Sequence, residues 1–388
     1  MTTSTPSTVR FGIIGIGNMG SGHATRVSKG EVPGLELAAI ADLRPEKAEL
    51  FPDVPFYNSG ADLIASGKVD AVLIATPHYD HTILGIAALE AGLHTLVEKP
   101  ISVHKADCEH LIAAHKDEKQ VFAAMFNQRT DPRYIKLKHL IDSGEFGKIN
   151  RVQWTITDWF RTAQYYSSGG WRATWEGEGG GVLLNQCPHQ LDLWQWLFGI
   201  PDSVRAHIEL GRFHDIEVED DVTAYLRYKD GMSGVFITTT GETPGTNRLE
   251  IAAERGRVVV EGTDITWTRN EEESSEFCAA TDSSFGRPDT WKIQIPFSGN
   301  GEQHLGILKN FANTILKGEK LIAPAKEGLH SVELANAMIY SGLNDCTVQM
   351  PLDGTAYETM LMDKIRNSTH KKVVKEPAGG ADDFSKSF

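Results

Sequence analysis

Three glycines near the N-terminus have the spacing of a phosphate-binding turn. The apolar run 9–14 leads into Gly15-x-Gly17-x-x-Gly20. Where a strand turns into a helix, the first glycine permits the turn, the second lets the backbone approach a pyrophosphate, and the third allows close packing. The N–H groups at the start of the helix bind phosphate, so we expect Asn18 and Met19 to lie at the same site.

A carboxylate follows at a suitable distance from this turn. Asp42 ends the next apolar run, 22 residues after Gly20. It could accept hydrogen bonds from both ribose hydroxyls of an adenosine and would repel a 2′-phosphate, which predicts NAD as the cofactor. Arg44 could pair with a phosphate, so NADP stays possible. The alternative is that Asp42 caps a helix starting near Pro45.

Polar residues close the third predicted strand, 69–76. They are Thr76, Pro77, His78 and His81. Ligands bind beyond the C-terminal ends of parallel strands, so we expect these residues on the cofactor side. The alternative is that both histidines belong to a surface loop.

A lysine closes the fourth predicted strand, in the segment Glu98-Lys99-Pro100. A lysine is costly to bury without a partner. Beside a nicotinamide, the Lys99 ammonium could hold or polarise a substrate oxygen, and a cis bond at Pro100 could aim it there. The alternative is a solvated lysine at a strand end.

A histidine near the middle of the chain follows a glycine-rich run, 177–181. Pro188 suits the first turn of a helix. In that helix His189, Asp192 and Trp196 share one face, whereas the opposite face is apolar and belongs to the core. The alternative role for His189 is that of a core histidine satisfied by Asp192 or a backbone carbonyl.

The elements that carry these residues alternate in the first 130 residues. Predicted strands at 9–15, 35–41, 69–76, 94–98 and 121–125 are separated by helices near 20–29, 59–66, 80–91 and 104–118. This alternation predicts βαβ units in a parallel sheet, which is a Rossmann-type α/β domain. The segment Asn127-Gln128-Arg129 follows the fifth strand and either touches cofactor or substrate or forms a structural loop.

The pattern changes after residue 131. A helix near 133–143 is followed by strands at 148–157, 203–210, 221–229, 233–239 and 247–260, with a hairpin turn at Lys229-Asp230-Gly231. These strands predict a mostly antiparallel sheet, and two helices near 302–317 and 326–344 either cover it or return to the first domain. We therefore expect domains at 9–130 and 131–365, with tails at 1–8 and 366–388.

Composition limits the kinds of partner. The 388 residues carry a net charge of -14 without a basic cluster, which argues against nucleic acid and anionic membranes. No apolar run is long enough to cross a bilayer. Four scattered cysteines indicate neither a disulfide framework nor a metal site, which suits a protein of the cytoplasm.

The order of these motifs resembles the Gfo/Idh/MocA family of sugar and inositol dehydrogenases, over roughly residues 9–345. The resemblance implies an N-terminal Rossmann domain and a C-terminal α/β domain with an open, mostly antiparallel sheet. It also implies a homodimer or homotetramer formed through that sheet. By resemblance Lys99 hydrogen-bonds the reacting hydroxyl and His189 is the general base, for which an imidazole pKa near 7 is well matched.

One position departs from the family pattern. Many members have Asp four residues before the catalytic histidine, and this chain has Asn185. An asparagine can hydrogen-bond but cannot stabilise an imidazolium by charge. We therefore expect either a less basic His189 or a supporting role for Asp192.

Aromatic residues and arginines between 158 and 175 are the candidates for substrate binding. Sugars are commonly held by apolar ring contacts together with fixed polar groups. The candidates are Arg161, Tyr165, Tyr166, Trp171 and Arg172. The two arginines could hold an anionic group or dense hydroxyls; the alternative is that several of the aromatic residues form core or subunit contacts.

The leading hypothesis is an NAD-dependent dehydrogenase of a secondary hydroxyl of a small carbohydrate: a sugar, glycoside or cyclitol. A second hypothesis is an NAD-dependent glycosidase, which oxidises transiently, eliminates the aglycone, adds water and reduces again. A third is a cofactor-binding sensor without chemistry, which the presence of both Lys99 and His189 disfavours.

Overall fold

The computed structural model describes residues 8–374. Of the two predicted tails, residues 1–7 and 375–388 lie outside the described part. Residues 366–374 are described, and the first two of them belong to a helix, α12 (Gly354–Asn367), that sequence patterns did not predict.

Six parallel strands form the first sheet, in the order β3-β2-β1-β4-β5-β6. The strands are β1 (Val9–Ile14), β2 (Leu35–Ala41), β3 (Phe56–Tyr57), β4 (Ala71–Ile74), β5 (His94–Val97) and β6 (Phe122–Ala124). The Rossmann arrangement is thereby confirmed. Since β1 lies between β2 and β4, the chain changes direction there, and a ligand is expected at that switch point.

Helices connect these strands and cover both faces of the sheet. They are α1 (Asn18–Ser28), η1 (Pro45–Leu50), α2 (Gly60–Ala65), α3 (His78–Glu90) and α4 (Lys105–Ala114). The predicted helices are present with small shifts of their ends. Both β1 and β4 are almost wholly buried, which is typical of strands in a parallel sheet covered on both faces.

Nine strands form the second sheet, in the order β14-β13-β12-β11-β7-β10-β9-β8-β15. The strands are β7 (Ile149–Ile156), β8 (Ser203–Leu210), β9 (Glu219–Arg227), β10 (Ser233–Thr239), β11 (Asn247–Ala253), β12 (Gly256–Glu261), β13 (Asp264–Asn270), β14 (Thr290–Gln294) and β15 (Val348–Gln349). Only the β7–β10 pair is parallel, so the predicted open, mostly antiparallel sheet is confirmed.

The prediction of one strand over 247–260 is wrong. The segment is a hairpin, because β11 and β12 pair antiparallel from Ala253 and Gly256 outward. Gly256 has a φ of 106°, and a Cβ there would lie 2.0 Å from the Thr268 carbonyl oxygen. That single glycine marks the turn, which the continuous apolar pattern on either side conceals.

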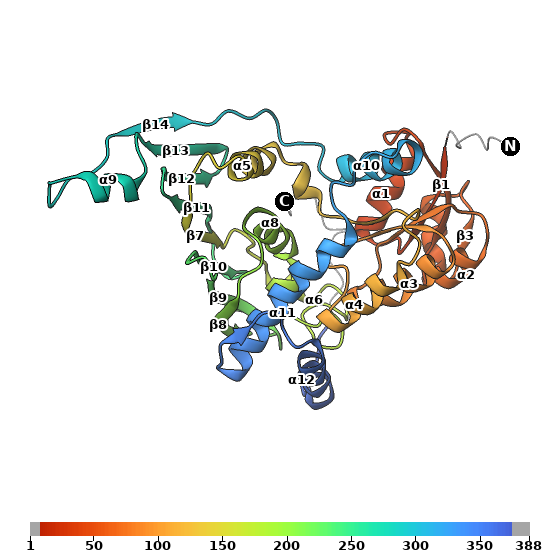
Figure 1. Cartoon of the computed structure of the whole chain (residues 1–388). Helices are drawn as coiled ribbons and strands as arrows, with labels where there is room; N and C mark the ends of the chain where they lie inside the picture. The colour runs from red at the N-terminus through yellow and green to blue at the C-terminus, as the bar shows by residue number, and fades with distance from the viewer. Residues whose placement is uncertain (1–7, 375–388) are drawn as a thin grey trace.

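Helices that follow β6 in the chain lie between the two sheets (Figure 1). Short helices η2 (Asn127–Thr130), α6 (Ala163–Ser167), α7 (Val182–Asn185) and η3 (Ala325–Glu327) accompany the longer α5 (Pro132–Asp142), α8 (Pro188–Phe198), α10 (His304–Lys317) and α11 (Gly328–Asn344). α8 and α11 cover the inner face of the second sheet, whereas Phe311 of α10 packs its ring against Phe11 of β1. Of the two expected late helices, one therefore covers the sheet and the other returns to the first domain.

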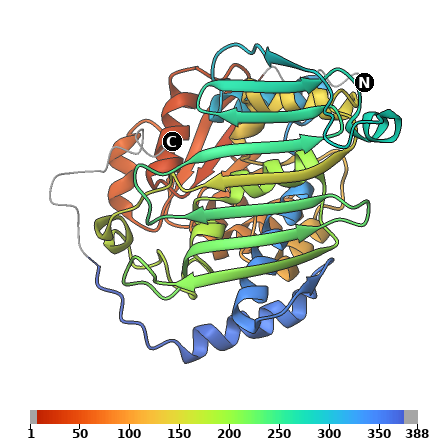
Figure 2. The same cartoon turned by 90° about the vertical axis from the view of Figure 1, so that its left-hand side faces the viewer.

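The opposite face of the second sheet faces the viewer in Figure 2, with no further layer of the described chain over it. Helix α9 (Ser274–Ala280) projects beyond the edge of the sheet near β14, as Figure 1 shows. All functional candidates from the sequence lie on the other side, in the region where helices and loops of both domains meet.

Candidate active site

The glycine turn has the geometry of a phosphate-binding site. Gly15 has a φ of 91°, and a Cβ there would lie 2.7 Å from the Ala75 carbonyl oxygen; a Cβ on Gly20 would lie 1.8 Å from the Gly15 carbonyl oxygen. A Cβ on Gly17 would instead meet nothing within 4 Å. Helix α1 begins at Asn18, directly after Gly17, so its first N–H groups face open space at the switch point of the sheet. These residues fit a dinucleotide pyrophosphate.

Asp42 lies at the end of β2, beside the same turn. Its carboxylate accepts hydrogen bonds from the Ile16 N–H (2.8 Å) and from the Arg44 N–H and Nε (3.0 and 2.9 Å). Burial alone would raise the pKa of Asp42, but the Arg44 contacts lower it. The carboxylate is therefore ionised and oriented, as ribose binding requires. It does not cap η1, whose N-cap residue is Arg44.

The residues after β4 divide into two kinds. The Thr76 hydroxyl oxygen is buried without a hydrogen-bond partner among the described residues, which fits a cofactor contact. Both ring nitrogens of His81 instead lie near backbone carbonyls, those of Pro100 (2.7 Å) and Thr76 (2.8 Å). His81 is thus a buried residue that connects two loops, and not a surface histidine. Both ring nitrogens are occupied by these backbone contacts and are not available to a cofactor. Helix α3 follows directly after Pro77.

Glu98 is likewise occupied by the protein. One carboxylate oxygen lies 2.8 Å from Nε2 of His23, and the other accepts from the Lys99 N–H (3.2 Å). Burial would raise the pKa of Glu98, but His23 lowers it to about 2. Glu98 therefore forms a structural pair with His23 after β5, and a contact of its carboxylate with the cofactor stays a prediction. His23, whose place on the site side of α1 carries no sequence signal, was not predicted.

Lys99 reaches from the first domain to the second. Its ammonium donates a hydrogen bond to the backbone carbonyl oxygen of Asn185 (3.0 Å). The Lys99–Pro100 peptide bond is cis, as expected. Burial lowers the pKa of Lys99, while the charges of Glu98 and Glu178 oppose that effect.

His189 occupies the first turn of α8 after Pro188, as predicted. It is buried, its ring meets the Phe126 ring edge-on, and neither ring nitrogen has a hydrogen-bond partner among the described residues. Burial, followed by the Lys99 charge, holds the pKa of His189 well below its usual value. This direction agrees with the expectation of a less basic His189, and the imidazole is neutral at physiological pH.

Asp192 does not support His189. Its carboxylate accepts a bidentate pair of hydrogen bonds from Arg129, at 2.7 Å from Nε and 2.6 Å from a terminal nitrogen. Arg129 also donates to Glu327 (2.5 Å), which is partly exposed, so one guanidinium serves two carboxylates. The Arg129 segment is therefore a structural connection between η2 and α8, and the proposed His189–Asp192 pair is wrong.

Asn185 has a carboxylate neighbour that sequence patterns did not reveal. The Asn185 side-chain nitrogen donates to Glu178, and the Asn185 side-chain oxygen accepts from the Tyr165 hydroxyl (3.1 Å). Glu178 is buried and also accepts from the Ala173 N–H (2.5 Å). It lies within the glycine-rich run, where a sequence pattern identifies the loop but not the direction of one side chain.

Two arginines stack on Tyr165 near these residues. The Arg161 and Arg172 guanidinium carbons lie 5.1 and 4.7 Å from the Tyr165 ring centre, and Arg172 donates to the Tyr165 hydroxyl (2.9 Å). The Trp171 ring meets the His78 ring edge-on at 5.5 Å, which links the segment to the first domain. The structure thus brings these predicted residues together around Lys99.

Tyr166 differs from its neighbour. It is buried, its hydroxyl bonds to the Thr240 hydroxyl (2.8 Å), and its ring packs on His214. For this residue the alternative holds: it is a core contact under the segment and not a substrate ligand.

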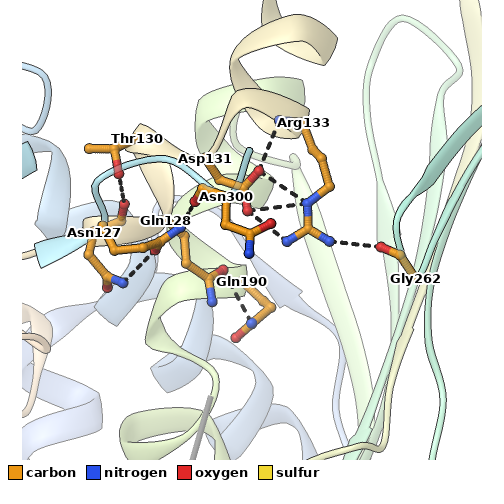
Figure 3. Close-up of polar contacts among 9 residues, drawn as sticks. Asn127, Gln128, Thr130, Asp131, Arg133, Gln190, Gly262 and Asn300 are labelled. Atoms are coloured by element: carbon orange, nitrogen blue, oxygen red, sulfur yellow. Dashed lines mark hydrogen bonds and ion pairs between the residues drawn. The ribbon is translucent and has the colours of Figure 1, made fainter. Parts of the chain in front are cut away.

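Gln128 lies where η2 meets the start of α8 (Figure 3). Its side-chain carbonyl faces the Gln190 amide at 3.4 Å, while Asn127 of the same turn donates to Gln303 (2.9 Å). The neighbouring Asp131 and Arg133 form an ion pair, and Arg133 also donates to the Gly262 carbonyl.

His304, at the start of α10, packs on His23, and burial lowers the pKa of His304 to about 4. Like His23, it carries no sequence signal.

Two family models match the chain. One is the oxidoreductase family with an NAD-binding Rossmann fold, over residues 9–126, and the other is the GFO/IDH/MocA C-terminal domain, over residues 134–259. The chain therefore belongs to the Gfo/Idh/MocA family of NAD-binding oxidoreductases, as its motifs predicted.

Particular relatives are dehydrogenases of cyclitols and sugars. The chain is 27% identical over 262 residues to myo-inositol 2-dehydrogenase of Thermotoga maritima, covering 64% of this chain and 74% of that protein. It is 37% identical over 147 residues to inositol 2-dehydrogenase 1 of Saccharopolyspora erythraea, a match to 36% of this chain and less than half of that protein (43%). Among solved structures, the WlbA dehydrogenase of Bordetella pertussis in complex with NADH and UDP-GlcNAcA matches with a TM-score of 0.74 and 28% identity over 89% of this chain and 100% of that chain.

Within 8–374 no group of His, Cys, Asp and Glu is arranged to hold a metal ion, and no helix there is long and apolar enough to span a membrane. All four cysteines are free thiols.

Proposed function

We propose that this protein uses NAD to oxidise a secondary hydroxyl of a sugar, glycoside or cyclitol. The observation that carries the proposal is the contact between Lys99 of the first domain and Asn185, one turn before His189 of the second. The Lys99 charge also lowers the pKa of His189, so an ammonium group and a neutral imidazole lie close to one another, next to the end of β5 where we expect the reactive ring of a Rossmann cofactor.

The two side chains would divide the proton chemistry. When bound, NAD supplies the hydride acceptor. The Lys99 ammonium donates a hydrogen bond to the reacting oxygen, which favours the charge that develops on it. His189 is neutral because its pKa lies well below the usual value, so a ring nitrogen can take the hydroxyl proton.

The relatives define which compounds to test. Their names include myo-inositol 2-dehydrogenase and levoglucosan dehydrogenase, and the B. pertussis WlbA dehydrogenase binds UDP-GlcNAcA. Arg161 and Arg172, stacked on Tyr165, supply fixed donors for sugar hydroxyls or for a carboxylate.

A panel of substrates tests the proposal. Purified protein is incubated with NAD and with myo-inositol, levoglucosan, neutral sugars, uronic acids or aryl glycosides, and NADH absorbance is recorded. Growth of NADH absorbance with one of these compounds supports a dehydrogenase. Release of an aglycone without NADH would instead establish the redox-neutral glycosidase, and neither signal across the panel would contradict both.

We also propose that the outer face of the second sheet joins two copies of the chain. Residues Tyr225, Val235 and Ile237 of β9 and β10 lie on that face, and no layer of the described chain covers them (Figure 2). Light scattering after size exclusion measures the mass. A monomer at all concentrations would contradict this interface.

A further inference from the structure

A buried carboxylate lies directly behind the residues that the proposed reaction uses. Glu178 is 2% exposed, and its carboxylate accepts hydrogen bonds from the Ala173 N–H and the Asn185 side-chain amide. Among residues 8–374 no lysine or arginine side-chain nitrogen lies within 4.0 Å of it; burial raises the pKa of Glu178, and the charges of Arg172 and Lys372 oppose that effect. A buried carboxylate without a direct ion pair is costly, so its retention needs a reason.

The contacts of Glu178 lead to Lys99 through one residue. The Asn185 side-chain amide donates a hydrogen bond to the Glu178 carboxylate. The Asn185 backbone carbonyl accepts a hydrogen bond from the Lys99 ammonium at 3.0 Å. The Glu178 backbone carbonyl also lies 3.4 Å from Nδ1 of His78, on the cofactor side. The residue therefore connects both domains at the site.

Charges around this connection are mixed. Lys99 is influenced by the carboxylates of Glu98 and Glu178 and by the cations Arg161 and Arg172, and it acts in turn on the imidazoles of His78 and His189. Glu98 is already held by His23. Glu178 faces Arg172 and Lys372 on its other side, and Glu219 and Tyr165 nearby. Glu98 and Glu178 are thus the two carboxylates that act on the ammonium, and Glu178 is the one that is hydrogen-bonded to Asn185.

We propose that Glu178 is a positioning residue for Lys99. It holds Asn185, whose carbonyl fixes the ammonium, and it supplies from the glycine-rich loop the negative charge that an aspartate at position 185 would carry. The inference rests on the proposed function, in which Lys99 binds the reacting oxygen. The effect of the Glu178 charge on the pKa of Lys99 can be measured without a substrate.

The Glu178 charge acts on the pKa of Lys99 in one direction. Burial lowers the pKa of Lys99, and the Glu178 charge opposes that effect. Glu178→Gln keeps the shape and an acceptor for the Ala173 N–H but removes the charge. The ammonium then loses its proton at a lower pH.

Competitive labelling with acetic anhydride tests this, because only the unprotonated amine reacts. The full chain is labelled across a pH series, and acetylation of the peptide that contains Lys99 is quantified by mass spectrometry. In Glu178→Gln the labelling midpoint of Lys99 is expected to move to lower pH, with several-fold more label at neutral pH. Glu176→Gln removes an exposed carboxylate from the same loop and is expected to leave the midpoint unchanged.

Two more variants separate charge from folding. Glu178→Gln combined with Asn185→Asp returns a carboxylate to the same place and is expected to restore the wild-type midpoint. Glu178→Asp keeps the charge and is expected to do the same. An unchanged Lys99 midpoint in Glu178→Gln, or no recovery in the double variant, would overturn the proposal. Because no sugar is used, these results stand apart from failure of the substrate panel.

Discussion

At the scale of single residues, the His189 imidazole decides the proposed chemistry. Both ring nitrogens lack a partner among the described residues, so a bound hydroxyl would be the first group to engage the ring. We expect His189→Ala to lower kcat by roughly 10²–10⁴-fold, because general-base catalysis is lost. Affinity for NADH is expected to stay unchanged, since the phosphate turn is remote in sequence and belongs to the other domain.

Steady-state kinetics on the best compound of the panel and a fluorescence titration with NADH measure the two effects. Full turnover in the variant would refute the role of His189.

A second prediction at this scale concerns cofactor choice. Asp42→Ala removes the carboxylate expected to accept the ribose hydroxyls and frees Arg44 from its pair. Loss of charge-assisted hydrogen bonds costs about 1.5–3 kcal/mol, so the dissociation constant for NAD is expected to rise about 10- to 100-fold. The ratio of NADP to NAD affinity is expected to increase.

Titrations with both nucleotides measure this ratio, and Asp53→Ala, an exposed carboxylate in the following loop, is the control. Unchanged NAD affinity in Asp42→Ala would place the ribose elsewhere.

At the scale of elements, the Arg129–Asp192 pair joins η2 to α8. Asp192→Asn weakens the two charge-assisted hydrogen bonds from Arg129 and leaves Glu327 as its remaining ion-pair partner, so the free energy of unfolding is expected to fall by roughly 1.5–3 kcal/mol. The pH dependence of turnover is expected to stay the same, because Asp192 does not contact His189. Urea unfolding measures the first effect.

Asp363→Asn breaks an exposed pair with Arg366 and is expected to change stability little. A shifted pH profile at unchanged stability would restore the discarded His189–Asp192 partnership.

Helix α7 depends on another buried carboxylate, Glu219, whose side chain accepts from the Gly181 and Leu183 N–H groups (2.8 and 3.1 Å). Burial raises the pKa of Glu219 from 4.5 to about 7. Between these values the folded chain keeps a proton that the unfolded chain loses, so this group lowers stability as pH rises.

We expect Glu219→Gln to remove this slope, a difference of roughly 3 kcal/mol across the interval from pH 4.5 to pH 7. Urea unfolding of both proteins at several pH values tests it, and parallel curves would contradict the assignment.

Much of this arrangement could be predicted from the sequence. Apolar period and glycine spacing identified the parallel sheet and placed Lys99 at the ligand-binding end of its strands, whereas the role of His189 followed from the resemblance to the family. What could not be predicted depends on contacts between distant segments. Glu178 and Arg129 acquire their roles only when segments of both domains meet, and His23 only when α1 packs beside Glu98. Tyr165 and Tyr166 are adjacent, but Tyr165 contacts the arginines of the site whereas Tyr166 packs on His214 in the core.

At the scale of the whole molecule, the C-terminal segment returns to the candidate site. Lys372 donates to the backbone carbonyls of Tyr166 and Arg172, and Ser368 donates to Glu217 (2.5 Å). Lys372→Met is expected to loosen the segment 160–178 and speed hydrogen exchange of its amides.

Exchange measured by mass spectrometry gives the comparison, with the exposed Lys371→Met as control. Equal exchange in the two variants would mean that the contact does not hold the segment.

The return of α10 to β1 has a consequence for protein engineering. The Phe311–Phe11 contact and the hydrogen bond from the Ala124 N–H to the Ala323 carbonyl (3.0 Å) complete the first domain with residues from far along the chain. A chimera that exchanges only residues 9–126 with a relative would place a foreign sheet against the native α10. To preserve these contacts, segments 9–126 and 304–325 must come from the same parent. A chimera of this kind needs at least two crossovers.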